Sequence, residues 1–400
     1  SECGVKLTRL THRKSDRPVT KPGRADPGTT RRRHRHEGAE HMMKCTMYSY
    51  STSPHVSQLY TGFSILRMNG EINLEQKPNN YCHKGERMMK HLSPQAFNGL
   101  FVTINEEKVI FYDTADGPNL NEEALEVADL YFKRSYLCED VPERYRLRVF
   151  PLGLNYEVYA GKVDYLEVAR MLRRKSLTNG WPIELMRWIA RFASVSFLPT
   201  VHNMCAQPKP DQEPRVLFMA RAWDPNDVAP GLPAEIKEDH VQINKTRAHC
   251  IQLLRKELGK YFYGGFAHNS YAVANYKDLL LEDAGISRKK IYISILHQYP
   301  ICIATTGLQG SIGWKMGEYV AFSKSIVSER LNFSVPGTFE RNRNYLEFDT
   351  PELCLQQTVR LVEDKHIRRQ MMENNWHYYQ MNLKPDKLIL GTLNIAQYIL

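Results

Sequence analysis

The sequence predicts an α/β fold made of two β/α domains, each built on a mostly parallel sheet. Three observations support this prediction. The chain has 400 residues, well above the roughly 150 residues of a typical domain. Short apolar and β-branched runs alternate with stretches of helical periodicity along most of it. A polar, proline-containing stretch at 199–214 divides this alternation in two and predicts an interdomain linker.

Composition excludes several other classes of protein. Hydrophobic residues make up 42% of the chain and charged residues 24%, which is usual for a globular protein and excludes disorder throughout. No run of 18 apolar residues occurs, so the sequence does not predict an integral membrane protein. The eight cysteines form no C-x-x-C pair, which fits neither a disulfide framework nor a zinc ribbon. These observations predict a cytoplasmic protein.

The first 42 residues predict a disordered basic extension. Residues 1–41 hold 11 Lys or Arg against 5 Asp or Glu, more than half of the chain's net charge of +10. They lack apolar periodicity and end in the basic run 31–36, just before Met42 and Met43. We favour an extension, of vector or upstream origin, that precedes a start at one of these methionines. The alternatives are a basic arm that binds polyanions through Arg31 to Arg35 and a targeting segment.

The first domain is expected over residues 43–198. It opens with a strand at 44–50, a loop that holds His55 and a helix through Leu59 to Leu66. Further strands are predicted at 71–74, 100–104, 109–112 and 146–151, and a helix at 122–131. The strand at 109–112 ends in the sequence Asp113, Thr114, Ala115, Asp116 and Gly117.

Two basic helices are expected between residues 160 and 200. They carry charged side chains such as Arg173, Arg174 and Lys175 beside an apolar stripe. The favoured interpretation is a pair of packing helices with a solvated basic face. The alternative is a peripheral contact between 160–195 and an anionic membrane surface, at the inner face of the membrane.

The second domain is expected over residues 215–385. Its first strand, 215–220, is a continuous apolar run and delivers Arg221 to its carboxyl end. The elements predicted after it are helices at 244–258, 271–281 and 289–299 and strands at 261–266 and 301–305. The tail at 386–400 predicts a helix that packs back on the first domain.

The stretch 305–322 predicts a phosphate-binding site. A buried strand runs into a glycine-rich loop at 307–313, and the loop runs into a helix, which directs backbone N–H groups and the positive helix end at an anion. Lys315 adds a positive charge, and Glu318 is placed to accept two hydrogen bonds from a ribose diol. Alternatively, the glycines permit tight strand–helix packing and Glu318 complements the helix dipole. Neither G-x-G-x-x-G nor G-x-x-x-x-G-K-[ST] occurs, which argues against a dehydrogenase and a kinase.

From Gly317 to Glu329 the sequence resembles the carboxyl-terminal domain of GT-B glycosyltransferases, in which a Glu-x-x-Ala helix precedes a small-residue turn and a β-branched strand. The segment 344–375 is similar to the end of that domain, and 216–221 resembles its first strand. The resemblance covers residues 215–385 and is closest to the group-1-like, spore-maturation-protein-like branch. It implies two Rossmann-like β/α/β domains that face each other across a cleft, with the acceptor bound by the first and the nucleotide sugar by the second.

The resemblance also implies a function, the transfer of a sugar from a nucleotide-diphosphate sugar to a hydroxyl group in glycan or cell-surface polysaccharide synthesis. Glu318 matches the glutamate that holds the donor ribose, and Arg221 matches the arginine that faces the diphosphate. One position departs from the pattern, because many relatives carry another glutamate where this chain has Gly310. How the donor sugar is held, and whether transfer is retaining, therefore stay open. The other donor-side candidates lie in or just after the glycine-rich loop: Gly310, Ser311, Gly313 and Lys315.

Three residues of the first domain are candidates for the catalytic base, namely His55, Asp113 and Asp116. Each follows a predicted strand, and α/β sheets bind ligands beyond the carboxyl ends of their strands. Each also has an ordinary interpretation, as a loop histidine or as a helix cap or turn residue. His268 is a weaker donor-side candidate. No D-x-D triplet follows a strand, and GT-B enzymes generally work without a bound metal, so we expect neither a metal nor another cofactor.

The expected partners are a nucleotide-sugar donor and a glycan, lipid-linked or protein acceptor, with no specific nucleic acid. A second hypothesis is a catalytically silent binding or scaffold protein on the same fold, because Gly310 replaces an acidic residue. Failure to bind any nucleotide diphosphate would favour it. A third class, polyanion binding through the basic run, predicts that deleting residues 1–41 abolishes function.

Overall fold

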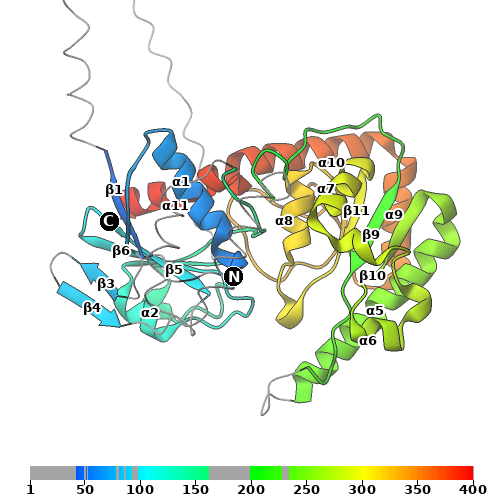
Figure 1. The fold of residues 1–400 in the computed structure, drawn as a ribbon, viewed down its shortest axis with the longest axis horizontal. Coiled ribbons are helices and arrows are strands. Elements are labelled where there is room, and N and C mark those ends of the chain that lie inside the picture. Colours follow the sequence, from blue (N-terminus) through cyan, green and yellow to red (C-terminus); the bar gives the residue numbers. More distant parts are fainter. Residues whose placement is uncertain are drawn as a thin grey trace, which may run out of the picture. The chain divides into compact units, whose positions relative to one another are not determined.

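The structure is a computed structural model that describes residues 42–48, 51, 53–77, 81–84, 87–91, 98–161, 199–227 and 234–399. Two sheets of mostly parallel strands with packed helices make up these residues (Figure 1). The predicted α/β class is therefore confirmed. The helices expected within 160–195 and nearly all of the basic extension lie outside the described residues.

The first sheet is mixed rather than wholly parallel. Its strand order is β2-β1-β5-β6-β7-β8, and β5 runs antiparallel to both β1 and β6 while the other pairs are parallel. The turn at 105–107, with positive φ at Asn105 and Glu106, is too short for a crossover and joins β5 to β6 as a hairpin. The strands are β1 (Lys44–Tyr48), β2 (Asn73–Lys77), β5 (Gly99–Ile104), β6 (Lys108–Asp113), β7 (Leu130–Lys133) and β8 (Val149–Pro151). A separate hairpin pairs β3 (Tyr81–Lys84) with β4 (Arg87–His91).

The helix predicted at 122–131 is wrong in its second half. Helix α2 spans only Glu122–Val127, and Leu130–Lys133 forms β7, which is buried at all four positions. A strand covered on both faces shows no alternation, so a short apolar run after a helix looks like the helix continuing. The Asp129 carboxylate accepts a hydrogen bond from the Val109 N–H at 2.8 Å and sets the start of β7 beside β6.

The second sheet is parallel throughout its described strands, in the order β10-β9-β11-β12-β13. Helices cover both of its faces, so successive residues of β9 enter different cores: Leu217 belongs to one cluster and Phe218 to the other. The strands are β9 (Val216–Ala220), β10 (Phe262–Phe266), β11 (Ile301–Ala304), β12 (Ser325–Glu329) and β13 (Leu346–Phe348). The helices are α5 (Ala234–Leu258), α6 (Ser270–Asn275), α7 (Lys289–Gln298), α8 (Trp314–Ala321), α9 (Pro351–Glu363) and α10 (Lys365–Tyr378).

The last helix, α11 (Pro385–Ile399), packs on the elements of the first sheet. It crosses α1 (Ser57–Met68) closely, and Gly62 lies at the crossing, against the Pro385 carbonyl group. A hydrogen bond of 2.8 Å joins the hydroxyls of Thr392 and Tyr112, the latter on β6. The chain thus returns from the second sheet to the first at its end.

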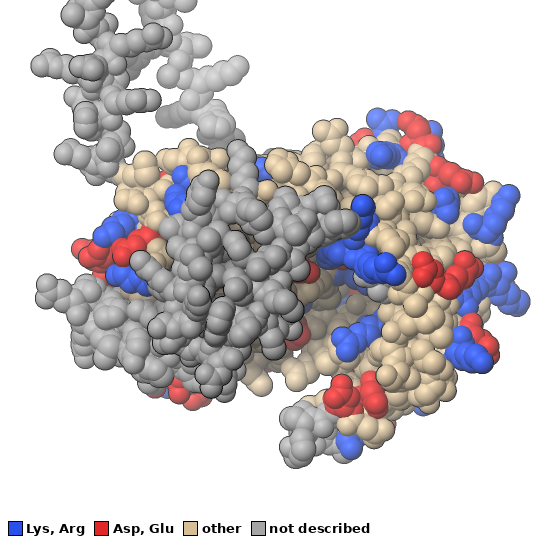
Figure 2. Space-filling model, viewed as in Figure 1, with Lys and Arg blue, Asp and Glu red and all other residues tan. Residues whose placement is uncertain are grey.

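The surface carries charges of both signs. Figure 2 shows a group of Lys and Arg side chains near the middle of the face in view, with Asp and Glu side chains interspersed around it. Within the described ranges, none of the helices combines the length and the apolar character that a bilayer crossing requires.

Candidate functional site

The strand order of the second sheet marks a position for a ligand. From β9 the chain moves to β10 on one side, and it later returns to form β11 on the other side of β9. The loops after β9 and β11 therefore diverge at the carboxyl edge, and open α/β sheets bind ligands at such a switch point. The loop after β9 begins with Arg221, and the loop after β11 is the glycine-rich segment 307–313.

Arg247, from α5, ties these two loops together. Its guanidinium donates to the Arg221 carbonyl at 2.6 Å, to the Thr305 hydroxyl at 2.9 Å and to the Thr306 carbonyl at 2.8 Å. The side chain is buried, and burial lowers its pKa to about 10, so it stays charged at neutral pH. Glu329, at the end of β12, accepts hydrogen bonds from the Thr306 N–H at 2.6 Å and from its hydroxyl at 2.8 Å. Hydrogen bonds from Arg247 and to Glu329 thus fix the two loops at the switch point.

The glycine-rich loop folds on itself before it enters α8. The Gly307 N–H donates to the Ser311 carbonyl at 2.7 Å. Gln309 and Gly310 both adopt the left-handed region, with φ of 55° and 67°, a region that favours glycine. Gly313 then occupies the N-cap position of α8, and the first N–H groups of a helix point out of its end. Gly310, Ser311 and Gly313 therefore lie where the sequence placed them, between a buried strand and a helix N-terminus.

Lys315 and Glu318, both on α8, belong to a small charged cluster with α7. The Glu318 carboxylate accepts from Lys289 Nζ at 2.7 Å and from the Tyr292 hydroxyl at 2.6 Å. Lys315 Nζ lies 4.4 Å from the centroid of the Tyr292 ring, and burial lowers its pKa although Glu318 acts in the opposite direction. Both oxygens of Glu318 are therefore engaged by the protein. A ribose diol would have to share this carboxylate with Lys289 and Tyr292, two residues that the sequence analysis missed.

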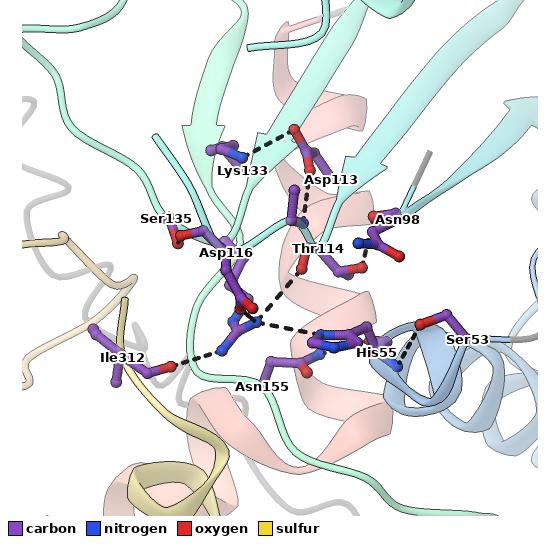
Figure 3. Close-up of polar contacts among 12 residues, drawn as sticks. Ser53, His55, Asn98, Asp113, Thr114, Asp116, Lys133, Ser135, Asn155 and Ile312 are labelled. Carbon is purple, nitrogen blue, oxygen red and sulfur yellow. Dashed lines mark hydrogen bonds and ion pairs between the residues drawn. The ribbon is translucent and has the colours of Figure 1, made fainter. Parts of the chain in front are cut away.

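A second cluster lies at the carboxyl edge of the first sheet, where the Arg134 guanidinium contacts His55, Asp116 and Ile312; Figure 3 shows these three residues near one another. Arg134 follows β7, is 4% exposed and forms an ion pair with Asp116. Its Nη1 lies 3.4 Å from His55 Nδ1, and its Nη2 donates to the Ile312 carbonyl at 2.7 Å. Burial lowers the pKa of His55, Asp116 opposes this and Arg134 adds to it, so the imidazole is neutral at pH 7.

The two aspartates have different surroundings. Asp113 is buried, and its carboxylate accepts from the Tyr131 hydroxyl, from Lys133 Nζ at 3.1 Å and from the Ala115 N–H at 2.8 Å. These bonds anchor the loop after β6 and leave the carboxylate little room for a ligand. The side chain of Asp116 is 48% exposed, so its carboxylate is accessible.

Contacts join the Arg134 cluster to the glycine-rich loop and the start of α8. Besides the bond from Arg134 to Ile312, the ring centroids of His55 and Trp314 lie 4.7 Å apart, with an angle of 63° between the ring planes. Trp314 is the first residue of α8. The Asn155 side chain donates to the His55 carbonyl at 2.9 Å. Two buried polar atoms here, Trp314 Nε1 and Asn155 Oδ1, have no hydrogen-bond partner among the described residues. Buried donors and acceptors of this kind require a partner, which a water molecule or a polar ligand can supply.

The remaining predicted residues lie apart from this contact. Arg221 is exposed, and its guanidinium lies 4.5 Å from the centroid of the Trp223 ring. His268 is exposed after β10, and its Nε2 lies 2.7 Å from the Leu281 carbonyl oxygen, so that nitrogen is engaged. In the described part of the chain, no three His, Cys, Asp or Glu side chains gather in a way that could hold a metal ion.

Comparison with known proteins gives structural matches only. No protein-family model and no curated protein matches this sequence. A glycosyltransferase from Rickettsia africae shares 12% identity over 72% of this chain and 70% of its own, with a TM-score of 0.39. Sucrose-phosphate synthase from Thermosynechococcus elongatus shares 11% identity over 86% and 92%, with a TM-score of 0.37.

A third match is a TarM variant from S. aureus in complex with Fondaparinux, alpha-GlcNAc-glycerol and UDP. It shares 10% identity over 75% of this chain, which spans 63% of the TarM chain, with a TM-score of 0.33. All three TM-scores lie below 0.5.

Proposed function

We propose that the chain is a glycosyltransferase of the GT-B type, which moves a sugar from a nucleotide-diphosphate sugar to a hydroxyl acceptor. One observation carries the proposal. The glycine-rich loop at the switch point of the second sheet contacts the His55 and Arg134 cluster of the first through Ile312 and Trp314. A donor held by that loop would thus present its sugar to a base and a cation from the other sheet.

On the donor side, we assign the diphosphate to the backbone N–H groups at the start of α8 together with Arg221 and Lys315. A leaving diphosphate gathers negative charge in the transition state, and preorganised cations and N–H groups stabilise it. Glu318 would hold the ribose while it keeps Lys289 in place. No metal is required by this arrangement, and metal independence is part of the proposal.

On the acceptor side, His55 and Asp116 are the two candidates for the base. When Arg134 donates to His55 Nδ1, the imidazole proton resides on Nε2. His55 then acts as a donor to the acceptor hydroxyl, and it becomes a base only after changing tautomer. Asp116, exposed beside the same guanidinium, can accept the proton directly. Glycan, lipid-linked and protein acceptors all supply such a hydroxyl, and a lipid-linked acceptor would suit the alternative in which 160–195 contacts a membrane surface.

Titration of the full chain with a panel of nucleoside diphosphates and their sugars tests the donor site. We expect the nucleotides of one nucleobase to bind saturably, with or without EDTA. Arg221→Met is expected to weaken that binding about tenfold. Arg360→Met is the matched control, because Arg360 is an exposed arginine on α9. Absence of binding across the panel would contradict the proposal and favour a scaffold protein.

The pH dependence of transfer tests His55. Because burial lowers its pKa, the neutral form persists below the usual imidazole range, and activity is expected to fall only as the pH drops below that range. His55→Gln is expected to reduce turnover about 100-fold and to remove this limb of the pH–rate profile. His366→Gln, at an exposed position of α10, should change neither. An unaltered profile in His55→Gln would assign the base to Asp116.

A further inference from the structure

The amino edge of the second sheet, at the opposite end of the strands from the site above, gathers basic side chains from three segments. Lys324 lies between α8 and β12, His297 lies in the last turn of α7, and Lys209 lies in the segment that leads to β9. Gln212 fixes this segment to α7, because its Nε2 donates to the His297 carbonyl at 3.0 Å.

Lys324 is held in a buried position by its backbone. Ser323 ends α8 in the left-handed region, with φ of 54°, and the Lys324 N–H donates to the Tyr319 carbonyl at 2.9 Å. The Asn375 side chain donates to the Lys324 carbonyl at 2.8 Å. Lys324 as a whole is only 5% exposed. These bonds fix the backbone of Lys324 and leave only a small part of the residue open to solvent.

The Lys324 ammonium has no acceptor in this position. Across the described residues, no oxygen accepts a hydrogen bond from its Nζ, which lies 5.9 Å from the centroid of the Phe322 ring. A buried cation without a hydrogen-bonded partner is costly. Burial accordingly lowers the pKa of Lys324 to about 8.

The basic side chains near Lys324 add positive charge, which the carboxyl ends of α7 and α8 compensate only in part. The half-buried His297 ring lies 5.1 Å from the Phe322 ring, and Lys209 and Lys324 both lower its pKa beyond the effect of burial. Burial raises the pKa of the adjacent Cys302 thiol to about 12, so it is neutral. The segment of Lys209 also carries Asp211, but this carboxylate pairs with Lys365 at 2.8 Å. Within the described residues, then, no carboxylate pairs with the three basic groups.

We propose that Lys324, His297 and Lys209 form a binding site for a phosphate group, either inorganic phosphate or the end of a phosphate monoester. Donors from three segments suit a tetrahedral oxyanion with several acceptor oxygens, and a doubly charged anion offsets the repulsion among them. Lys209 is exposed, so the ion has a path from solvent. The site is separate from the proposed donor site, which lies at the carboxyl edge of the same strands.

Calorimetric titration of the full chain with inorganic phosphate tests this site. Titrations at constant ionic strength and pH 7.5, in two buffers of different ionisation enthalpy, also give the number of protons bound. We expect saturable binding in which the protein takes up protons, because phosphate favours the charged forms of Lys324 and His297. The protons that phosphate itself releases when it binds as the dianion are subtracted from the measured number. A parallel titration with glycerol phosphate shows whether the site prefers the free ion or a monoester.

Variants assign the ion to one edge of the sheet. Lys324→Met is expected to weaken phosphate binding at least tenfold. We expect the same of Lys209→Met, which changes an exposed side chain and so does not threaten folding. Lys256→Met, whose side chain is 78% exposed on α5, should leave it unchanged. The proposal fails if phosphate does not saturate, if both variants bind it like the parent, or if Lys315→Met removes it. In that last case the ion belongs to the carboxyl edge.

Discussion

Arg247→Met is expected to lower the free energy of unfolding by about 3 kcal/mol and to weaken nucleotide binding at the same time. The guanidinium supplies hydrogen bonds to the Arg221 and Thr306 carbonyls and to the Thr305 hydroxyl. Methionine fills a similar volume but leaves these acceptors without a donor in a buried place, at a cost of about 1–3 kcal/mol for each group that water cannot reach. The loops after β9 and β11 would then lose their shared anchor.

A second arginine of the same helix separates the effect on the loops from the effect on stability. Arg255 also donates from α5 to backbone carbonyls, those of Gly264, Asp278 and Leu280, but they lie away from the switch point. Denaturant unfolding and nucleotide titration of both variants would be compared. We expect Arg255→Met to lose stability while it keeps the affinity for nucleotide. Equal affinities in the two variants would show that Arg247 does not position the site.

The second sheet was predictable because its strands and glycine-rich loop have recognisable local sequence patterns. β9 and β11 are buried on both faces, so each appears as a continuous apolar run, and each ends in a polar or glycine-rich loop. The beginning of α8 after Gly313 follows from the same local pattern. The sequence also placed Glu318 one turn into this helix. Elements whose sequence pattern lies within one short segment could therefore be located from the sequence.

The contacts that make up the site could not be predicted in the same way. Arg134 follows a strand that resembles the end of a helix in sequence, and nothing nearby marks it as the centre of a cluster. Its bond to Ile312 joins residues 178 positions apart. The engagement of Glu318 by Lys289 and Tyr292 likewise depends on α7 packing beside α8. The sequence can suggest that a carboxylate binds a ribose, but only the packed structure shows which side chains already occupy it.

Gly62→Ala is expected to destabilise the protein by about 2 kcal/mol, because α1 and α11 cross without space for a methyl group. A Cβ at this position would lie 2.9 Å from the Pro385 carbonyl carbon and closer still to its oxygen. Backbone atoms cannot move aside as a flexible side chain would, so the helices must separate. Alanine favours a helix over glycine by about 1 kcal/mol, which offsets only part of this cost.

Gly391→Ala, on α11, is the matched control. A Cβ there meets no atom within 4 Å, so the substitution should bring the gain in helix propensity alone, up to about 1 kcal/mol. The two variants are thus expected to shift the free energy of unfolding in opposite directions and to differ by about 3 kcal/mol in denaturant unfolding. If both raised stability, the close contact between α1 and α11 at Gly62 would not be present in solution.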